Sequence, residues 1–184
     1  MRKANFERFL MQFINPEGSH RIICPQNEEI LLEDISPGTR SFALDITVEG
    51  ENTTVMVRGK VHTTGEEKKQ WDISLTLLGK NQSATLLLRG VADDASRIVF
   101  DGSGVIKATT ENGKMRIDEK VFLFSKNASA QALPVLRVET DTVQSASHSA
   151  SITPFSEEIL FFLSSRGISP EEAKEVLKEG VLHF

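Results

Sequence analysis

Apolar and polar residues alternate along much of this chain, a pattern typical of short strands that bury one face. The clearest case is Ser41–Val48, in which every second side chain from Phe42 onward is apolar. Further short segments rich in Val, Ile, Leu and Thr follow as far as Ile152, separated by Gly, Asn and Asp turns. The pattern predicts strands at Arg21–Cys24, Glu29–Leu32, Ser41–Val48, Thr54–Arg58, Trp71–Leu78, Ser83–Gly90, Ser96–Asp101, Val105–Thr109, Lys114–Ser125 and Leu136–Glu139.

Helical periodicity is confined to the two ends of the chain. At the beginning, Phe6, Phe9, Leu10 and Phe13 fall at helical spacing and predict an amphipathic helix over Lys3–Ile14. Near the end, Ser156 is placed to cap a first helix over Glu157–Ser165. Ser169, Pro170 and Glu172 then form the signature of a capping box, which predicts a second helix from Pro170 to about Glu179 that stops at Gly180.

Repetition in the middle of the chain leaves two β architectures open. Thr54–Gly59 resembles Thr85–Gly90, and both segments end in an Arg-Gly pair. Short strands of this kind occur in both β-solenoids and β-sandwiches, and periodicity alone does not separate them. Since the strands are not interleaved with helices, the pattern argues against βαβ units.

Composition narrows the class of protein. The chain has 184 residues and a net charge of −5, so it carries no excess of positive charge for nucleic acid or an anionic membrane. Its one cysteine, Cys24, excludes an internal disulfide and a multi-cysteine metal site within one chain. We find no apolar run long enough to span a bilayer and no signal-peptide pattern, so we expect a soluble cytoplasmic protein.

Motifs for catalysis are missing from the sequence. There is no phosphate-binding lysine motif, no G-x-S-x-G elbow and no H-E-x-x-H. Ser103, in the segment Asp101–Gly104, is interpreted as a turn serine because the strand-turn-helix context of an activated nucleophile is lacking. We therefore expect a protein that is not an enzyme.

His148 is the strongest candidate for metal chemistry. It lies within Ser145–Ser151, where all the remaining residues are serine or alanine. Because these neighbours are small, the imidazole would be accessible to another chain. Neutral imidazole is a suitable ligand for iron or zinc. The alternative from the residues alone is a histidine that is only hydrogen-bonded within a strand.

The last third of the chain resembles the SufB/SufD family. The segments Leu133–Glu139 (LPVLRVE), Ser147–Ser151 (SHSAS) and Glu158–Ala173 (EILFFLSSRGISPEEA) follow the order and nearly the spacing of the family's P-x-L-x-I, S-H-G-A-T and L-F-Y-L-x-S-R-G-I elements. The resemblance is weaker back to about Val55. It departs from the family at Ala146, where many SufD-like members have a cysteine, and at Ser149, where the family has glycine.

This resemblance implies a fold and a division of the chain. The family core is a right-handed parallel β-helix, so we expect a mainly β protein of that type with a short N-terminal helix and a C-terminal two-helix segment. The expected parts are residues 1–40 for the N-terminal helix and first strands, 41–152 for the β-helix core and 153–184 for the helical segment. Together they would form one structural domain.

The resemblance also implies partners. A SufD-like subunit of an iron–sulfur cluster assembly complex would pair through its β-helix edge, around Ser147, His148 and Ser149, with a SufB-like chain or a second copy of itself. Its helical segment would dock on a SufC-like ABC ATPase. The residues expected at that ATPase interface are Glu157, Glu158, Phe161, Arg166, Gly167 and Ile168.

A cluster would not be held by this chain alone. Thiolates are the preferred ligands of iron–sulfur clusters, and the only cysteine is Cys24. We therefore expect no stably bound cofactor, but a transient cluster or iron at a subunit interface with His148 as a ligand. The competing hypothesis is a stand-alone β-solenoid or β-sandwich binding module with no role in cluster assembly.

Overall fold

The computed structural model describes residues 9–184. Its elements, in chain order, are β1 (Phe9–Ile14), β2 (Gly18–Cys24), β3 (Glu28–Asp34), β4 (Arg40–Val48), β5 (Thr54–Thr63), β6 (Lys68–Leu77), β7 (Ser83–Ala92), β8 (Arg97–Ile106), β9 (Lys114–Leu123), β10 (Ser129–Ala132), β11 (Val135–Val138), β12 (Ser145–Pro154), α1 (Glu157–Ser164) and α2 (Pro170–Leu182).

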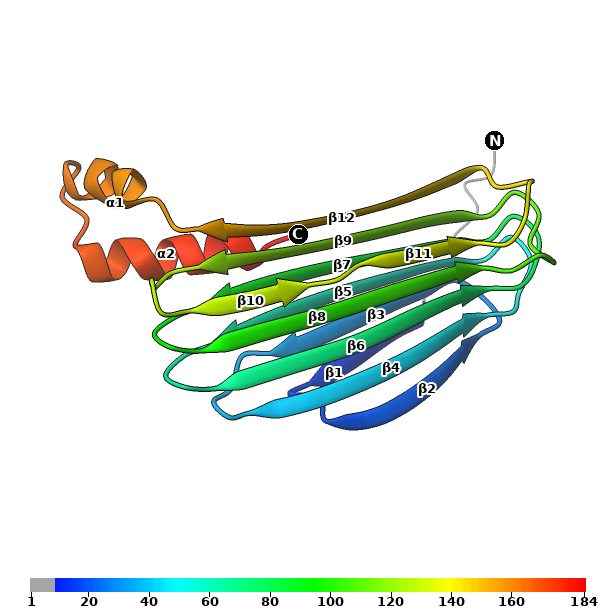
Figure 1. Cartoon of the computed structure of the whole chain (residues 1–184), viewed down its shortest axis with the longest axis horizontal. Helices are drawn as coiled ribbons and strands as arrows, with labels where there is room; N and C mark the ends of the chain where they lie inside the picture. Colours follow the sequence, from blue (N-terminus) through cyan, green and yellow to red (C-terminus); the bar gives the residue numbers. More distant parts are fainter. Residues whose placement is uncertain (1–8) are drawn as a thin grey trace.

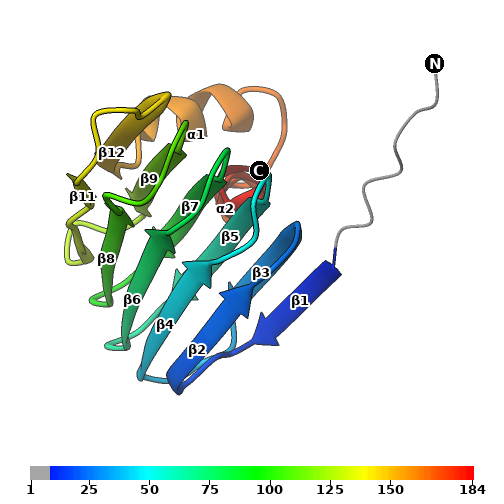
Figure 2. The same ribbon diagram turned by 90° about the vertical axis from the view of Figure 1, so that its right-hand side faces the viewer.

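The strands form two facing parallel sheets wound from one coil. One sheet, here sheet A, has the order β1-β3-β5-β7-β9-β12, and sheet B has the order β10-β8-β6-β4-β2, with β11 also paired to β8 (Figure 1). Successive strands alternate between the sheets, so each turn of the chain adds one strand to each (Figure 2). This is a β-solenoid, which confirms the expected fold class and excludes the sandwich alternative.

The interior of the solenoid is filled by side chains that stack in register. Phe42, Trp71 and Phe100 occupy equivalent positions in β4, β6 and β8. Their rings follow one another with centroid separations of 5.9 Å and 6.0 Å. The opposite sheet makes room with Gly59, where an added Cβ would lie 2.4 Å from the Trp71 ring. Because one coil cannot bury its apolar face alone, this stacking supplies the core.

The repeat seen in the sequence is real, but its register is shifted by two residues. Thr54 pairs with Ser83 and Met56 with Thr85, whereas the sequence similarity aligned Thr54 with Thr85. A shift of two keeps every side chain on its own face, because the side-chain period of a strand is two. The sequence similarity therefore matches side chains that lie on the same face, although it does not match the residues that pair.

Asparagines mark one corner of successive coils. Asn52, Asn81 and Asn112 all have a left-handed φ, between 54° and 57°. The Asn81 Nδ2 donates to Asn52 Oδ1 at 2.9 Å, and the Asn112 Nδ2 donates to Asn81 Oδ1 at 3.2 Å. Asparagine tolerates this conformation better than most residues, so the ladder fixes where each coil turns.

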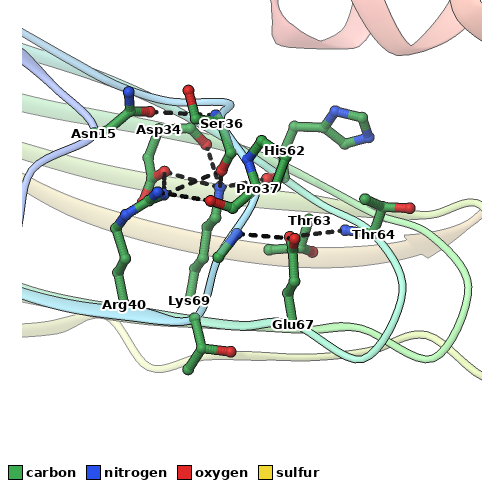
Figure 3. A network of polar contacts seen from close by, with 12 residues as sticks. Asn15, Asp34, Ser36, Pro37, Arg40, His62, Thr63, Thr64, Glu67 and Lys69 are labelled. Carbon is green, nitrogen blue, oxygen red and sulfur yellow. Dashed lines mark hydrogen bonds and ion pairs between the residues drawn. The ribbon is translucent and has the colours of Figure 1, made fainter.

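Another corner is held by a buried ion pair. The Lys69 ammonium is fully buried and lies 2.8 Å from Asp34 Oδ1, and it also donates to the backbone oxygens of Ser36 and His62 (Figure 3). Arg40 donates to the same Asp34 oxygen at 2.7 Å. These bonds tie β3, β5 and β6 together where the chain changes sheets.

The predicted N-terminal helix is wrong where it can be checked. Phe9–Ile14 is strand β1, paired in register with β3, and Lys3–Arg8 lies outside the described residues. The aromatic spacing that fits a helix also fits a strand, since Met11 and Phe13 alternate with outward-facing neighbours and pack against the core. The solenoid therefore begins before residue 41, the boundary expected for the core.

Smaller predictions also need correction. Ser96–Asp101 and Val105–Thr109 were expected as two strands, but β8 runs without a break through Ser103, which is not in a turn. The glycines on either side of Ser103 face the interior and leave space for side chains from the opposite sheet. Strand β10 was not predicted, and α2 continues past Gly180 to Leu182.

Candidate functional site

Strand β12 is the exposed edge of sheet A. Among residues 9–184 it pairs only with β9, in register from Ser145 opposite Lys114 to Pro154 opposite Leu123. Nearly all of its residues are exposed. An edge strand presents unpaired backbone N–H and C=O groups on its free side, which is a ready surface for pairing with another chain.

His148 faces the open end of the interior. It lies opposite Ile117, whose side chain is fully buried inside the solenoid. Residues directly paired in a parallel sheet point to the same side, so the imidazole is directed over the last covered layer of the core. No described strand covers it, and His148 is exposed.

Ser147 and Ser149 point to the outer face of sheet A. Ser147 lies opposite Arg116, and the Ser149 hydroxyl donates to Asp118 Oδ1 at 2.7 Å. Asp118 in turn accepts from the Arg89 Nη2 at 2.8 Å. This chain of contacts crosses β12, β9 and β7 and anchors the edge strand to the body of the sheet.

Asp118 is surrounded by positive charge. Besides Arg89, the Arg116 and Lys120 side-chain nitrogens each lie 3.9 Å from its Oδ2. Burial acts to raise the pKa of the Asp118 carboxyl, but the hydrogen bonds from Ser149 and Arg89 outweigh it and the pKa is lowered. The carboxylate therefore stays ionised and holds its partners at neutral pH.

A second carboxyl group, Glu119, points inward from the same strand. It is fully buried, and the backbone groups of Gly102 and Leu133 that face its carboxyl oxygens lower its pKa by less than burial raises it. The group is packed against Gly102, where an added Cβ would lie 2.3 Å from Oε1. Burial raises the pKa of Glu119 to about 7, so an appreciable fraction is neutral at physiological pH.

The helical segment carries the exposed aromatic that the sequence analysis selected. Phe161 is 78 % exposed on α1, and no residue of α1 is buried. Glu157 and Glu158 lie in the first turn of α1, and Glu157 is 3.8 Å from Lys126. An uncovered aromatic beside charged groups is the composition of an interface hot spot.

The residues after α1 form a tight turn into α2. The Arg166 guanidinium lies over the Phe162 ring, 4.4 Å from its centroid. Gly167 has a φ of +87°, a conformation that favours glycine, and the Ile168 N–H donates to the Leu163 oxygen. These three predicted interface residues are thus contiguous with the exposed face of α1.

Helix α2 attaches this segment to the solenoid. The Lys178 ammonium lies 2.9 Å from Asp93 at the end of β7 and 2.8 Å from Glu175. Ala173 is fully buried, and the Arg89 guanidinium lies 5.6 Å from the Phe184 ring centroid. Figure 1 shows α2 beside sheet A, with α1 beyond it.

The predicted sites form two separate groups. His148 and its serine neighbours lie in the first half of β12, Ser145–Pro154. Helix α1 follows the other end of that strand (Figure 1). Phe155 lies seven positions after His148 along mostly extended chain, a distance of about 23 Å at roughly 3.3 Å per residue. One molecule thus presents an edge strand and a helical face that separate partners could occupy.

Metal-binding side chains are sparse. No group of three or more His, Cys, Asp and Glu side chains able to hold a metal occurs among residues 9–184. Burial raises the pKa of the Cys24 thiol to about 12, which opposes formation of the thiolate that metals bind. The residues that the structure describes therefore offer no complete set of metal ligands.

Sequence reasoning missed Glu119 and the contact of Asp118 with Arg89. A signal for Glu119 was present, because it interrupts the apolar face formed by Met115, Ile117 and Val121. The Asp118 contact joins residues 29 apart in the sequence, and only the coil register brings them together.

Comparison with known proteins places the chain in a family. Residues 20–181 match the family model described as SUF system FeS cluster assembly, SufBD core domain. The chain is 29% identical over 150 residues to iron-sulfur cluster assembly protein SufD of Bacillus subtilis, covering 82% of this chain and 33% of that protein. It is 27% identical over 105 residues to SufB of the same organism, covering 57% and 22%. An iron-sulfur cluster assembly SufBD family protein of Staphylococcus saprophyticus is 28% identical over 102 residues, covering 55% and 22%.

The match extends over most of the solenoid and both helices, so the chain belongs to the SufBD core family. It spans about a third or less of the length of these curated relatives. In the part of the chain that the structure describes, neither helix has the length and apolarity needed to cross a bilayer.

Proposed function

We propose that this protein is a non-catalytic, SufD-like subunit of a cytoplasmic iron–sulfur cluster assembly complex. Its work would be to bind other proteins at two places. The β12 edge would pair with a SufB-like chain or a second copy, and the helical segment would dock on a SufC-like ABC ATPase. Family membership supports the general role, and the open edge of β12, with His148 facing the uncovered interior, is the observation that carries the proposal.

Pairing at β12 would change the surroundings of His148. A strand added to the free side of β12 would extend sheet A and cover the imidazole, because His148 faces the end of the interior. Ligands from the partner could then complete a site for iron or a cluster, which this chain would handle as cargo. Neutral imidazole suits iron, and the partner would have to supply thiolates.

Docking of the ATPase would use the exposed face of α1. Phe161 is the most exposed large apolar side chain described, and Glu157, Glu158 and Arg166 supply charge around it. Such an aromatic with a charged rim gives both affinity and specificity in protein interfaces. Because the Lys178–Asp93 ion pair fixes α2 to the end of β7, movement of a docked ATPase would be transmitted through α2 to the solenoid.

The experiment is a binding measurement between this chain and a SufC-like ATPase from the same genome. We expect the wild type to bind and the double variant Phe161→Ala, Arg166→Ala to bind roughly 100-fold more weakly or not at all. Val176→Ala is the matched control, because Val176 is 59 % exposed on α2 but lies outside the proposed interface.

Failure of the wild type to bind the ATPase would overturn the docking proposal. The protein would then be better described as a stand-alone β-solenoid binding module. Equal losses in the double variant and in Val176→Ala would place the interface elsewhere on the helices.

A further inference from the structure

The outer face of the edge strand carries only short polar side chains over most of its length. Strand β12 contains no charged residue, and its one proline is the last residue of the strand. On the side away from the core it presents a row of serines, Ser145, Ser147, Ser149 and Ser151. Free edges of natural sheets are usually protected by charges or by prolines within the strand. Strand β12 therefore lacks the usual protection against pairing with another strand.

The neighbouring strand β9 carries an excess of positive charge on the same face. Its outward side chains include three cations and one anion, Lys114, Arg116, Lys120 and Asp118. Lys120 also lies directly opposite Arg89 of β7. Like charges at directly opposed positions of two strands are unfavourable. The outer face beside the free edge is thus a place where positive charge accumulates.

Asp118 does not neutralise all of these cations. Its carboxylate already accepts hydrogen bonds from Ser149 at 2.7 Å and from Arg89 at 2.8 Å. The Arg116 and Lys120 nitrogens lie 3.9 Å from it, too far for a hydrogen bond, and their side chains are 61% and 43% exposed. Within residues 9–184 these two cations make no other ion pair. Because Arg89 already balances Asp118, positive charge remains uncompensated here in a chain whose net charge is −5.

We infer that the β12 edge selects a strand of a different chain that carries carboxylates at its outward positions. This inference rests on the proposed pairing at β12 and adds the chemistry of the partner. The added strand would lie two strand spacings from β9, roughly 9.5 Å away. Arg116 and Lys120 have long side chains, and the short serines of β12 leave space above the strand between them and the partner. Each would therefore reach a glutamate or aspartate on the added strand.

A second copy of this chain does not offer that chemistry. If the β12 strands of two copies paired with each other, each would meet the serines of the other and no carboxylate. The cations of both β9 strands would then remain without a counter-charge. A strand with outward acidic residues instead supplies ion pairs, and such complementarity favours one partner over another. The charge pattern thus favours a different chain over a second copy.

The experiment measures the affinity of the full chain for the SufB-like chain of the same genome at several salt concentrations. We expect the wild type to bind, and to bind more weakly as salt rises, because exposed charge pairs are screened. Arg116→Gln, Lys120→Gln should bind roughly tenfold more weakly and with less salt dependence. Arg116→Glu, Lys120→Glu should bind roughly 100-fold more weakly, because two repulsions would replace two attractions.

The matched control is Lys68→Glu, Arg97→Glu. These two exposed cations lie opposite each other on sheet B, and their reversal changes the net charge by as much as the reversal on β9. The control should bind like the wild type. Circular dichroism checks that each variant folds. If the charge reversal on β9 prevents folding, the glutamine variant and its salt dependence decide the result.

Different failures have different meanings. Binding that is equally tight in the wild type and in both β9 variants would overturn the inference and leave the proposed pairing standing. Equal losses in the sheet B control would also overturn it. A wild type that binds no SufB-like chain would overturn the inference together with the pairing. Tighter binding to a second copy, lost on charge reversal of β9, would assign the surface to self-association instead.

Discussion

The Arg89 guanidinium and the Asp118 carboxylate, 2.8 Å apart, connect the edge strand of the solenoid with its helical tail. On one side, Asp118 accepts a hydrogen bond from Ser149 of β12. On the other side, Arg89 lies against the ring of Phe184, after α2. The pair therefore lies between the two surfaces that we propose bind other proteins.

Removing Arg89 should destabilise the solenoid strongly. In Arg89→Met, the Asp118 carboxylate, whose side chain is only 3% exposed, loses its closest cation, so we expect a loss of roughly 3 kcal/mol in the free energy of unfolding. Denaturant unfolding measures this. Arg21→Met is the control, because its ion pair with Asp45 is exposed and should change stability by less than about 1 kcal/mol. Similar small losses in both variants would show that the Arg89 pair is not important for stability.

The register that creates this pair also explains what the sequence could predict. Alternation revealed which side chains face inward, and the capping residues Ser156 and Ser169 located both terminal helices. Contacts between coils, such as Arg89 with Asp118, depend on the number of residues in each turn, and local patterns do not encode it. Thr54 shows the same limitation, because it pairs with Ser83 and not with Thr85, the residue that the sequence similarity sets beside it.

The N-terminal error has a different origin. Phe9–Ile14 satisfies helical and strand periodicity equally over so short a segment, and pairing with β3 decides between them. His148 was found through its family motif, but its orientation follows only from its position opposite Ile117.

Glu119 should make stability depend on pH. The unfolded carboxyl titrates near its ordinary pKa of 4.5, whereas burial raises the folded pKa to about 7. As the pH rises from 4.5 to 7, the unfolded state loses its proton first, so the folded state becomes relatively less stable and the effect levels off above pH 7. Glu119→Gln should not lose stability in this way. Between pH 4.5 and pH 7, its free energy of unfolding should therefore rise relative to that of the wild type by a total on the order of 3 kcal/mol.

Denaturant unfolding at several pH values measures this difference. Glu66→Gln is the control, because Glu66 is exposed and should follow the wild type throughout. A difference between Glu119→Gln and wild type that stays constant from pH 4.5 to 7 would mean that Glu119 is not held neutral in the folded protein.

The attachment of α2 should depend on Lys178. In Lys178→Met the ion pair with Asp93 is lost, so α2 should separate from β7 more often. We expect faster amide hydrogen exchange in α2, by roughly tenfold, with unchanged exchange in β5 and β6. The control is Glu179→Gln, on the exposed side of the same helix. In this variant the amides of α2 should exchange at the wild-type rate. Unchanged exchange in α2 of Lys178→Met would show that apolar packing alone holds the helix.

The asparagine ladder should be sensitive to the backbone as well as to the side chain. Asn81→Ala removes the hydrogen bonds to Asn52 and Asn112 and places alanine at a φ of 54°. Its free energy of unfolding should therefore be lower than that of the wild type by about 2 kcal/mol or more. Asn81→Gly loses the same bonds but relieves the backbone, and it should lose less. Thermal unfolding compares the stability of the two variants. An alanine variant as stable as the glycine variant would be inconsistent with the left-handed backbone conformation at position 81.

The most direct test of the central claim measures iron–sulfur cluster maturation in cells that depend on this chain, with His148→Ala compared with wild type. The account predicts that His148→Ala folds, binds the ATPase and pairs at β12, yet fails to support maturation, because the exposed imidazole would no longer be available to the cargo. Full maturation with His148→Ala would contradict the role assigned to this end of the solenoid.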